Sequence, residues 1–260
     1  MWLTYSMDIA GNQFCPIFRS NTILLLLSFF LCKLGDPTVG GNLPPCPVAL
    51  EAIESALHEK GHAAGYANAC GIPEARKAIA HFHGRHVDGD EESVVIANGC
   101  SGTLEIALTA LLDSGTILLV PQPGFPLYEV IAQSHGASVV YYRLVSEQTW
   151  ECDLRYLQEL VDTYGTLVRG IVVNNPSNPT GAVFSKAHLE SMVKFCQQHR
   201  LPIVADEVYG DLTFTGCPFH PLANVVASLG HEVPIITVSG LAKQYLVPGW
   251  RIGWMVFQDK

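Results

Sequence analysis

The sequence is poor in charged residues and has no cluster of basic ones. Only 15% of its 260 residues are charged, and the formal net charge is −9. No run of lysines and arginines is present that could neutralise a row of phosphates. The sequence therefore argues against a nucleic-acid-binding protein.

Closely spaced cysteines are missing too. The 8 cysteines are scattered, and no two have the Cys-x-x-Cys spacing. Neither a zinc site nor a disulfide framework is indicated. Free thiols in a reducing compartment are the simplest account, so we expect a cytoplasmic protein without a metal.

No apolar run is long enough to cross a bilayer, which takes roughly 20 residues. The longest extends from Ile23 to Cys32. It has the length of a signal-peptide core, but Arg19 is the only base before it and no small-x-small cleavage site follows. A buried element, or a segment outside the ancestral domain, is favoured over membrane association. We therefore separate an atypical segment, residues 1–33, from a domain formed by residues 34–260.

Hydrophobic residues are plentiful, at 48% of the chain, and suffice for one large core. Apolar runs that predict buried strands alternate with segments of helical spacing. The strands are expected at 94–97, 117–120, 138–142, 168–173, 202–205 and 233–238, and helices at 48–59, 73–86, 104–112 and 186–198, with two more ending near 135 and 164. Such alternation implies an α/β domain with a mostly parallel sheet.

Residues with chemical potential follow these strands. They are Ser101, Phe125, Asn178, Asp206, Ser239 and Lys243. Ligand sites in open α/β sheets lie at the carboxyl ends of the strands. We therefore expect these side chains to share one site.

Lys243 stands among apolar and small residues, eight positions before Arg251. An apolar setting favours a neutral, nucleophilic amine, which can form a Schiff base with an aldehyde. Ser239 and Arg251 could hold a phosphate. An aldehyde and a phosphate together describe pyridoxal phosphate, PLP. The alternative is a solvated loop lysine and a surface arginine.

Asp206 closes an apolar strand, which is costly unless the carboxylate has a partner. A protonated pyridine nitrogen is such a partner. Tyr209 could reach the phenolic oxygen of the same ring, and Asn178 could donate an amide hydrogen bond to a ligand oxygen. Phe125 could stack on the ring. The small-residue loop 98–103, which leads into a helix, could bind an anion. The alternatives are a helix cap at Asp206, loop packing at Phe125 and an ordinary strand-helix turn at 98–103.

Five stretches together are specific to one family. They are residues 121–128, 174–181, 184–189, 205–211 and 239–254. From about Gly35 onward, the chain closely resembles class I aminotransferases of PLP fold type I. The resemblance implies the three-layer large domain of that fold, with a mostly parallel central sheet.

The resemblance also implies roles for single residues. Lys243 would bind the cofactor aldehyde and move the proton, Asp206 would keep the ring nitrogen protonated, and Phe125 would stack on the ring. Tyr209 and Asn178 would hydrogen-bond the ring oxygen. The phosphate would be bound by Cys100, Ser101, Gly102, Ser239 and Arg251, with Tyr66 from a neighbouring subunit. Gly35 would line the substrate site, and no metal is implied.

The implied activity is transfer of an amino group from an aromatic amino acid such as tyrosine to a 2-oxo acid. The implied assembly is a homodimer. Family chains continue past Lys260 into a small domain with an arginine for the substrate carboxylate, so we expect that domain to be absent and this chain alone to be a poor catalyst. The alternatives are alanine transamination, β-elimination, or a weakly active PLP-binding partner of a full-length subunit.

Overall fold

The computed structural model of the chain describes residue 38 and residues 43–58, 65–84, 90–230 and 232–258. Contacts divide the chain into two compact units, Met1–Pro44 and Pro45–Lys260. All elements below belong to the second unit. The apolar run at 23–32 and Gly35 lie outside the described residues. The proposed division of the chain near residue 33 therefore stays a prediction.

A single sheet forms the centre of the second unit. Its strands in the described residues are β1 (Val94–Asn98), β2 (Ile117–Gln122), β3 (Ser138–Val145), β4 (Glu151–Cys152), β5 (Val168–Asn174), β6 (Ile203–Asp206), β7 (Ile235–Gly240) and β8 (Ile252–Gln258). Their order across the sheet is β1-β8-β7-β6-β5-β2-β3-β4. Strands β3, β2, β5, β6 and β7 are parallel, whereas β8 and β4 run antiparallel to their neighbours. The predicted mostly parallel sheet is confirmed.

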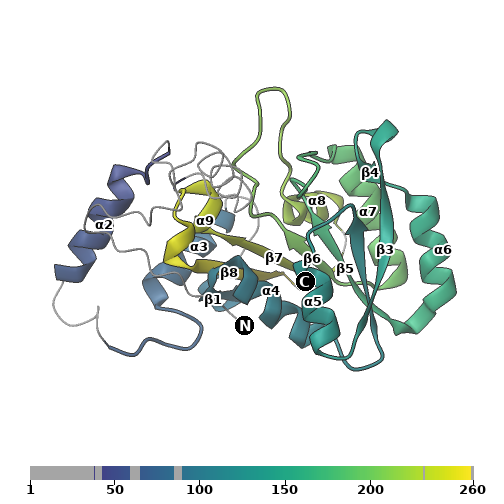
Figure 1. Cartoon of the computed structure of the whole chain (residues 1–260), viewed down its shortest axis with the longest axis horizontal. Coiled ribbons are helices and arrows are strands. Elements are labelled where there is room, and N and C mark those ends of the chain that lie inside the picture. Colours follow the sequence, from purple (N-terminus) through teal and green to yellow (C-terminus); the bar gives the residue numbers. More distant parts are fainter. Residues whose placement is uncertain (1–37, 39–42, 59–64, 85–89, 231, 259–260) are drawn as a thin grey trace, which may run out of the picture. The chain divides into compact units, whose positions relative to one another are not determined.

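Helices cover both faces of this sheet (Figure 1). In the described residues they are α2 (Pro47–His58), α3 (Pro73–Gly84), α4 (Gly99–Leu111), α5 (Leu127–Ser134), α6 (Leu154–Tyr164), α7 (Lys186–His199), α8 (Leu222–Leu229) and the short α9 (Leu241–Gln244). Side chains of α4 and α5 share one core cluster with the sheet, and those of α6, α7 and α8 share another. The domain therefore has the expected three layers of helix, sheet and helix.

Successive side chains along each central strand pack alternately into these two clusters. In β6, Ile203 and Ala205 pack with α7 and α8, while Val204 packs with α4 and α5. In β7, Ile236 and Val238 face the α4–α5 side. Because alternation has a period of two, Asp206 is placed on the α4–α5 side and Glu207 on the α8 side.

The strand directions bring the candidate residues to one edge. The parallel strands end there, at Gln122, Asn174, Asp206 and Gly240. Strand β8 runs the other way and begins at this edge, since its Ile252 pairs with Asn98 at the end of β1. Arg251, directly before β8, therefore comes to the same edge as Lys243 and the start of α4.

Several elements of the fold differ from the sequence-based prediction. Helix α4 begins at Gly99, so the expected loop 98–103 is in fact the end of β1 and the first turn of the helix. Strands β4 and β8 and helices α8 and α9 were not predicted. Helix α2 is where it was expected but buries none of its residues. Within the described ranges, no helix is long and apolar enough to cross a membrane.

Candidate functional site

The site begins where β1 turns into α4. Gly99 has a φ of 69°, and a Cβ added to it would lie 2.5 Å from Nη2 of Arg251. The Arg251 guanidinium thus lies directly against the first residue of α4, and its Nη1 donates a hydrogen bond of 3.2 Å to the Pro248 carbonyl. No side chain caps this helix start. Free N–H groups and a cation side by side form a place for an anion.

Cys100, Ser101 and Gly102 make up the rest of that first turn. Ser101 is exposed, and the other two are half-buried. Burial raises the pKa of the Cys100 thiol well above its usual value, and the Asp206 charge adds to the rise. Lys243 and Arg251 pull that pKa the other way, more weakly than burial raises it. The charges of Asp206, Lys243 and Arg251 therefore all act on the thiol of Cys100.

Asp206 is a buried carboxyl at the end of β6, with 4% of its surface exposed. The Tyr128 hydroxyl donates a hydrogen bond of 2.6 Å to its Oδ2, and the Val208 N–H lies 3.4 Å from its Oδ1. Burial raises the pKa of Asp206, and these two hydrogen bonds oppose the rise. The residue does not cap a helix, because β6 leads into a turn. It is therefore a fixed carboxyl whose charge calls for a cationic partner.

Lys243 and Tyr209 approach each other from separate elements. The Nζ of Lys243, in α9, lies 5.6 Å from the centre of the Tyr209 ring. Tyr209 stands in the turn after β6, three residues past Asp206, and both it and Lys243 are half-buried. This distance allows a cation–π contact. The turn after β6 thus places Tyr209 between Asp206 in sequence and Lys243 in space.

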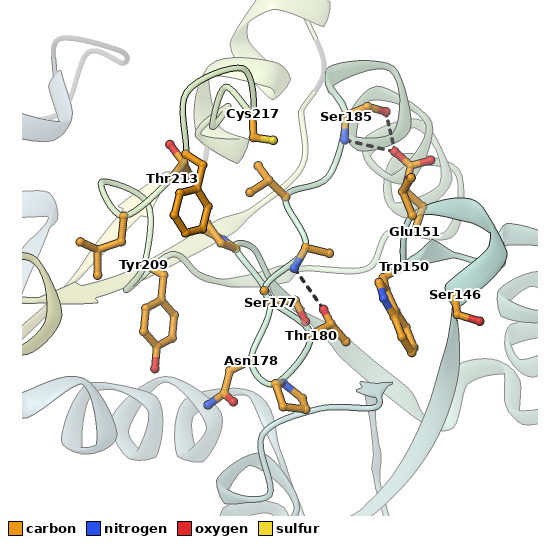
Figure 2. A pocket seen from close by; sticks show the side chains of 18 residues that line it. Ser146, Trp150, Glu151, Ser177, Asn178, Thr180, Ser185, Tyr209, Thr213 and Cys217 are labelled. Carbon is orange, nitrogen blue, oxygen red and sulfur yellow. Dashed lines mark hydrogen bonds between the residues drawn. The ribbon is translucent and has the colours of Figure 1, made fainter. Parts of the chain in front are cut away.

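The segment after β5 is held rigidly. The Asn174 side chain accepts the N–H of Asn178 at 2.6 Å and donates to the backbone carbonyl of Asp206 at 3.1 Å. Asn178 and Tyr209 line a cavity of about 790 Å³ (Figure 2). In Figure 2 their side chains lie together at one end of this cavity, and Ser185 and Glu151 lie at the other.

Phe125 lies next to Tyr128, with ring centres 5.7 Å apart and planes at 84°. It packs against the α4–α5 core cluster and lines a different cavity, beside Pro121 and Tyr141. The Phe125 ring thus lies just past the carboxyl end of β2, as the sequence predicted. Its described contact is the edge-to-face one with Tyr128.

Ser239 stands apart from this group. It lies inside β7 rather than after it, and its Oγ is buried without a hydrogen-bond partner. It lines a third cavity, of about 440 Å³, together with Glu207 and Gln244. The hydroxyl belongs to the α8 side of the sheet, whereas Asp206 and Cys100 belong to the α4–α5 side. Neither the 790 Å³ cavity nor this one includes Lys243, Asp206 or Arg251.

Two further predicted residues stand outside the cluster. Tyr66 is fully exposed. Gly35 is among the residues that the structure does not describe. Among the described ranges, no group of His, Cys, Asp and Glu side chains could hold a metal ion.

Sequence reasoning missed Gly99, Tyr128 and Glu207. Tyr128 lies in α5, whereas Phe125 precedes that helix, so helical spacing did not relate them. The hydrogen bond of Tyr128 to Asp206 joins residues 78 positions apart and left no local signal. Glu207 directly follows Asp206 and is equally buried, so its alternation to the opposite face could have been anticipated. Gly99 gave no signal beyond its being a glycine next to a strand.

Comparison with known proteins gives concordant results. The model of the family described as "Aminotransferase class I and II" matches residues 32–260. The chain is 38% identical to tyrosine aminotransferase of Homo sapiens and 41% identical to that of Mus musculus, with all of this chain and 57% of each relative covered. It thus spans little more than half the length of these curated relatives.

Solved structures give the same picture. The crystal structure of tyrosine aminotransferase from Leishmania infantum superposes with a TM-score of 0.80 at 34% identity, covering 86% of this chain and 60% of that one. Alanine aminotransferase from Pyrococcus furiosus superposes with a TM-score of 0.77 at 31% identity, covering 90% and 60%.

Proposed function

Because the chain belongs to the aminotransferase class I and II family, we propose that it is the cofactor-binding part of a PLP-dependent aminotransferase. The reaction is transfer of the amino group of L-tyrosine, or a similar aromatic amino acid, to 2-oxoglutarate or another 2-oxo acid. The observation that carries this proposal is the gathering of a buried carboxyl, a lysine and an arginine around the first turn of α4.

The residues fit PLP in two respects. Asp206 is a buried carboxyl whose raised pKa a ring N–H⁺ would lower. Gly99 leaves the space that the Arg251 guanidinium takes beside the uncapped start of α4, where a phosphate belongs. The unpaired Oγ of Ser239, by contrast, lies toward α8 in a cavity that neither Asp206 nor Arg251 lines, so it adds nothing to this fit. When bound, PLP supplies an aldehyde for the amino group and a ring that accepts electrons from the α-carbon.

The chain's own groups then divide the work. Lys243 Nζ would hold the cofactor aldehyde and would be the group that moves a proton at the substrate α-carbon. Asp206 keeps the ring nitrogen charged, and Tyr128 holds Asp206 in place through its 2.6 Å hydrogen bond. Tyr209 and Asn178 bind the ring oxygen. Phe125 would pack on the cofactor ring, and the N–H groups of Cys100, Ser101 and Gly102 would bind its phosphate together with Arg251.

We also propose that the protein works as a homodimer in the cytoplasm. Full exposure of Tyr66 fits a residue that contacts the phosphate of the other subunit, as the family resemblance implies. The cysteines of the described residues are all free, which agrees with a reducing compartment. The partners of the site are amino acids and 2-oxo acids.

The preference for an aromatic donor rests on the named relatives and is tested by product analysis. The protein is incubated with PLP, 2-oxoglutarate and either tyrosine or alanine, and mass spectrometry quantifies glutamate and the new oxo acid. We expect 4-hydroxyphenylpyruvate from tyrosine at a rate at least about tenfold above that of pyruvate from alanine, a difference of roughly 1.4 kcal/mol. The opposite preference would overturn the aromatic assignment. No oxo acid from any donor, even when the chain is extended by the homologous C-terminal domain of a relative, would overturn the activity.

A further inference from the structure

Glu207 is the one strongly perturbed carboxyl of this region that the proposed function does not use. Only 6% of its surface is exposed, and it lies on the α8 side of β6, opposite Asp206. A buried carboxyl survives in a fold when it has hydrogen-bond partners. Its partners indicate what it does.

Glu207 is held at three points. Its N–H donates to the Val238 carbonyl at 2.9 Å, and its own carbonyl accepts the Gly210 N–H at 2.9 Å. Its Oε1 accepts the N–H of Leu222 at 2.7 Å. Leu222 is the first residue of α8, so one side chain connects the end of β6 with the start of the next helix.

This connection closes the loop formed by residues 207–222. Within the loop, a Cβ added to Gly210 would lie 2.7 Å from the Phe219 ring, so that ring packs directly on the turn. The turn carries Tyr209, whose ring faces Lys243 Nζ. Toward its tip, by contrast, Phe214 is 87% exposed. The base of the loop is therefore fixed, and the position of Tyr209 depends on that base.

We propose that Glu207 is a positioning residue: its bond to Leu222 closes loop 207–222 and holds Tyr209 in place opposite Lys243. The catalytic meaning of this inference rests on the proposed function. The loop closure itself does not, because it concerns the protein without cofactor.

The cavity that Glu207 lines offers hydrogen-bond partners to its buried carboxyl. Ser239 Oγ and Gln244 Oε1 line this cavity and have no partner. Burial raises the pKa of Glu207 to about 8, the Leu222 hydrogen bond opposes the rise, and the Asp206 charge adds to it. His83 and Asp211 are the other titratable residues lining the cavity. A protonated Glu207 can donate its O–H to the Ser239 Oγ or the Gln244 Oε1, directly or through water.

The first test is hydrogen exchange of the cofactor-free protein at pH 7. Glu207→Leu removes the acceptor, Glu207→Asp withdraws it by one methylene, and Glu207→Gln keeps an acceptor oxygen and a donor. We expect the amides of residues 208–222 to exchange about tenfold faster in the Leu and Asp variants and within about threefold of wild type in the Gln variant. The matched control is Asp211→Asn, which changes an exposed carboxyl of the same cavity and should leave exchange unchanged.

If the Leu variant does not fold, the Asp variant decides. Wild-type exchange rates in both the Leu and Asp variants would overturn the proposal. If the Leu variant does not fold, wild-type exchange rates in the Asp variant alone would overturn it. So would a Gln variant that exchanges as fast as the Leu variant.

The second test asks whether Glu207 acts through Tyr209. We expect Glu207→Asp to weaken PLP binding about tenfold in the wild-type background and less than about twofold in a Tyr209→Phe background, because coupled residues are not additive. Equal losses in both backgrounds would contradict a positioning role. A wild-type protein that binds no PLP would instead contradict the proposed function, and the exchange experiment would still decide the loop closure.

Discussion

At the scale of single residues, the account depends most on Asp206. Its carboxyl is buried and is fixed by the hydroxyl of Tyr128. We expect Asp206→Asn to slow transamination by more than about tenfold, roughly 1.4 kcal/mol, and to weaken PLP binding less. Asparagine keeps the size and loses the charge, which matters most when negative charge develops on the substrate.

Half-reaction rates and PLP titration of this variant separate the two effects. The control is Asp211→Asn, five residues on, where an exposed carboxyl is replaced in the same way. Equal losses in rate and affinity at Asp206 would mean that it serves only to bind the cofactor.

Glu207 makes stability depend on pH. Its folded-state pKa of about 8 lies above its ordinary value of 4.5. The neutral form is therefore favoured in the fold, and its contribution is complete below about pH 4.5 and is lost as the pH rises to about 8. We expect the free energy of unfolding of cofactor-free protein to fall across this window on the order of a few kcal/mol.

Denaturant unfolding at pH 5 and pH 8 measures that fall. The fall should be smaller in Glu207→Gln, which cannot ionise, although Asp206 also has a raised pKa and contributes in the same direction. An identical fall in wild type and variant would show that Glu207 has an ordinary pKa in the fold.

At the scale of elements, the close approach of β8 to the start of α4 builds the anion place. A Cβ added to Gly253 of β8 would collide with the backbone of Gly99 and Cys100. We expect Gly253→Ala to destabilise the protein by about 1–3 kcal/mol, because overpacking forces the backbone apart. The matched control is Gly249→Ala, where nothing lies within 4 Å of the added atom. Thermal unfolding compares the two, and a Gly253→Ala variant as stable as the control would mean that the two elements are not in contact.

Much of the fold could be predicted from sequence, for a reason visible in its elements. Of the predicted parallel strands, β2, β5, β6 and β7 are largely apolar and buried on both faces, and such runs signal strands regardless of context. Helix α4 was placed too late because Gly99, Ser101 and Gly102 are weak helix formers. Packing against β8 overrides that preference. Strand β8 is interrupted by Gly253, and α8 is short and has no side-chain cap, so neither carried a usable pattern.

The candidate site was less accessible to sequence reasoning. The edge position of Asp206 and Lys243 follows from strand ends alone. The bond of Tyr128 to Asp206 joins residues 78 positions apart, and no local pattern reports such a contact. Ser239 was grouped with Arg251, but alternation along β7 turns its side chain to the other face. That separation requires the strand register, which the sequence did not supply.

At the scale of the whole molecule, we expect a homodimer. Tyr66 is fully exposed, and the apolar residues of α2, among them Val48, Ile53 and Leu57, are exposed as well. Exposed apolar surface of this kind favours association. Sedimentation velocity should give twice the monomer mass of 28.3 kDa. Tyr66→Phe should lower PLP affinity without changing that mass, and a monomer with full PLP affinity would contradict the shared site.

The central claim is that this chain binds PLP through Lys243, and one measurement addresses it directly. The protein is mixed with PLP, treated with borohydride to make any link to an amine permanent, digested, and analysed by mass spectrometry. We expect visible absorbance before reduction and a phosphopyridoxyl group on the peptide that contains Lys243. In Lys243→Ala, both should be absent. A label on another lysine, or the same absorbance in Lys243→Ala, would contradict the account.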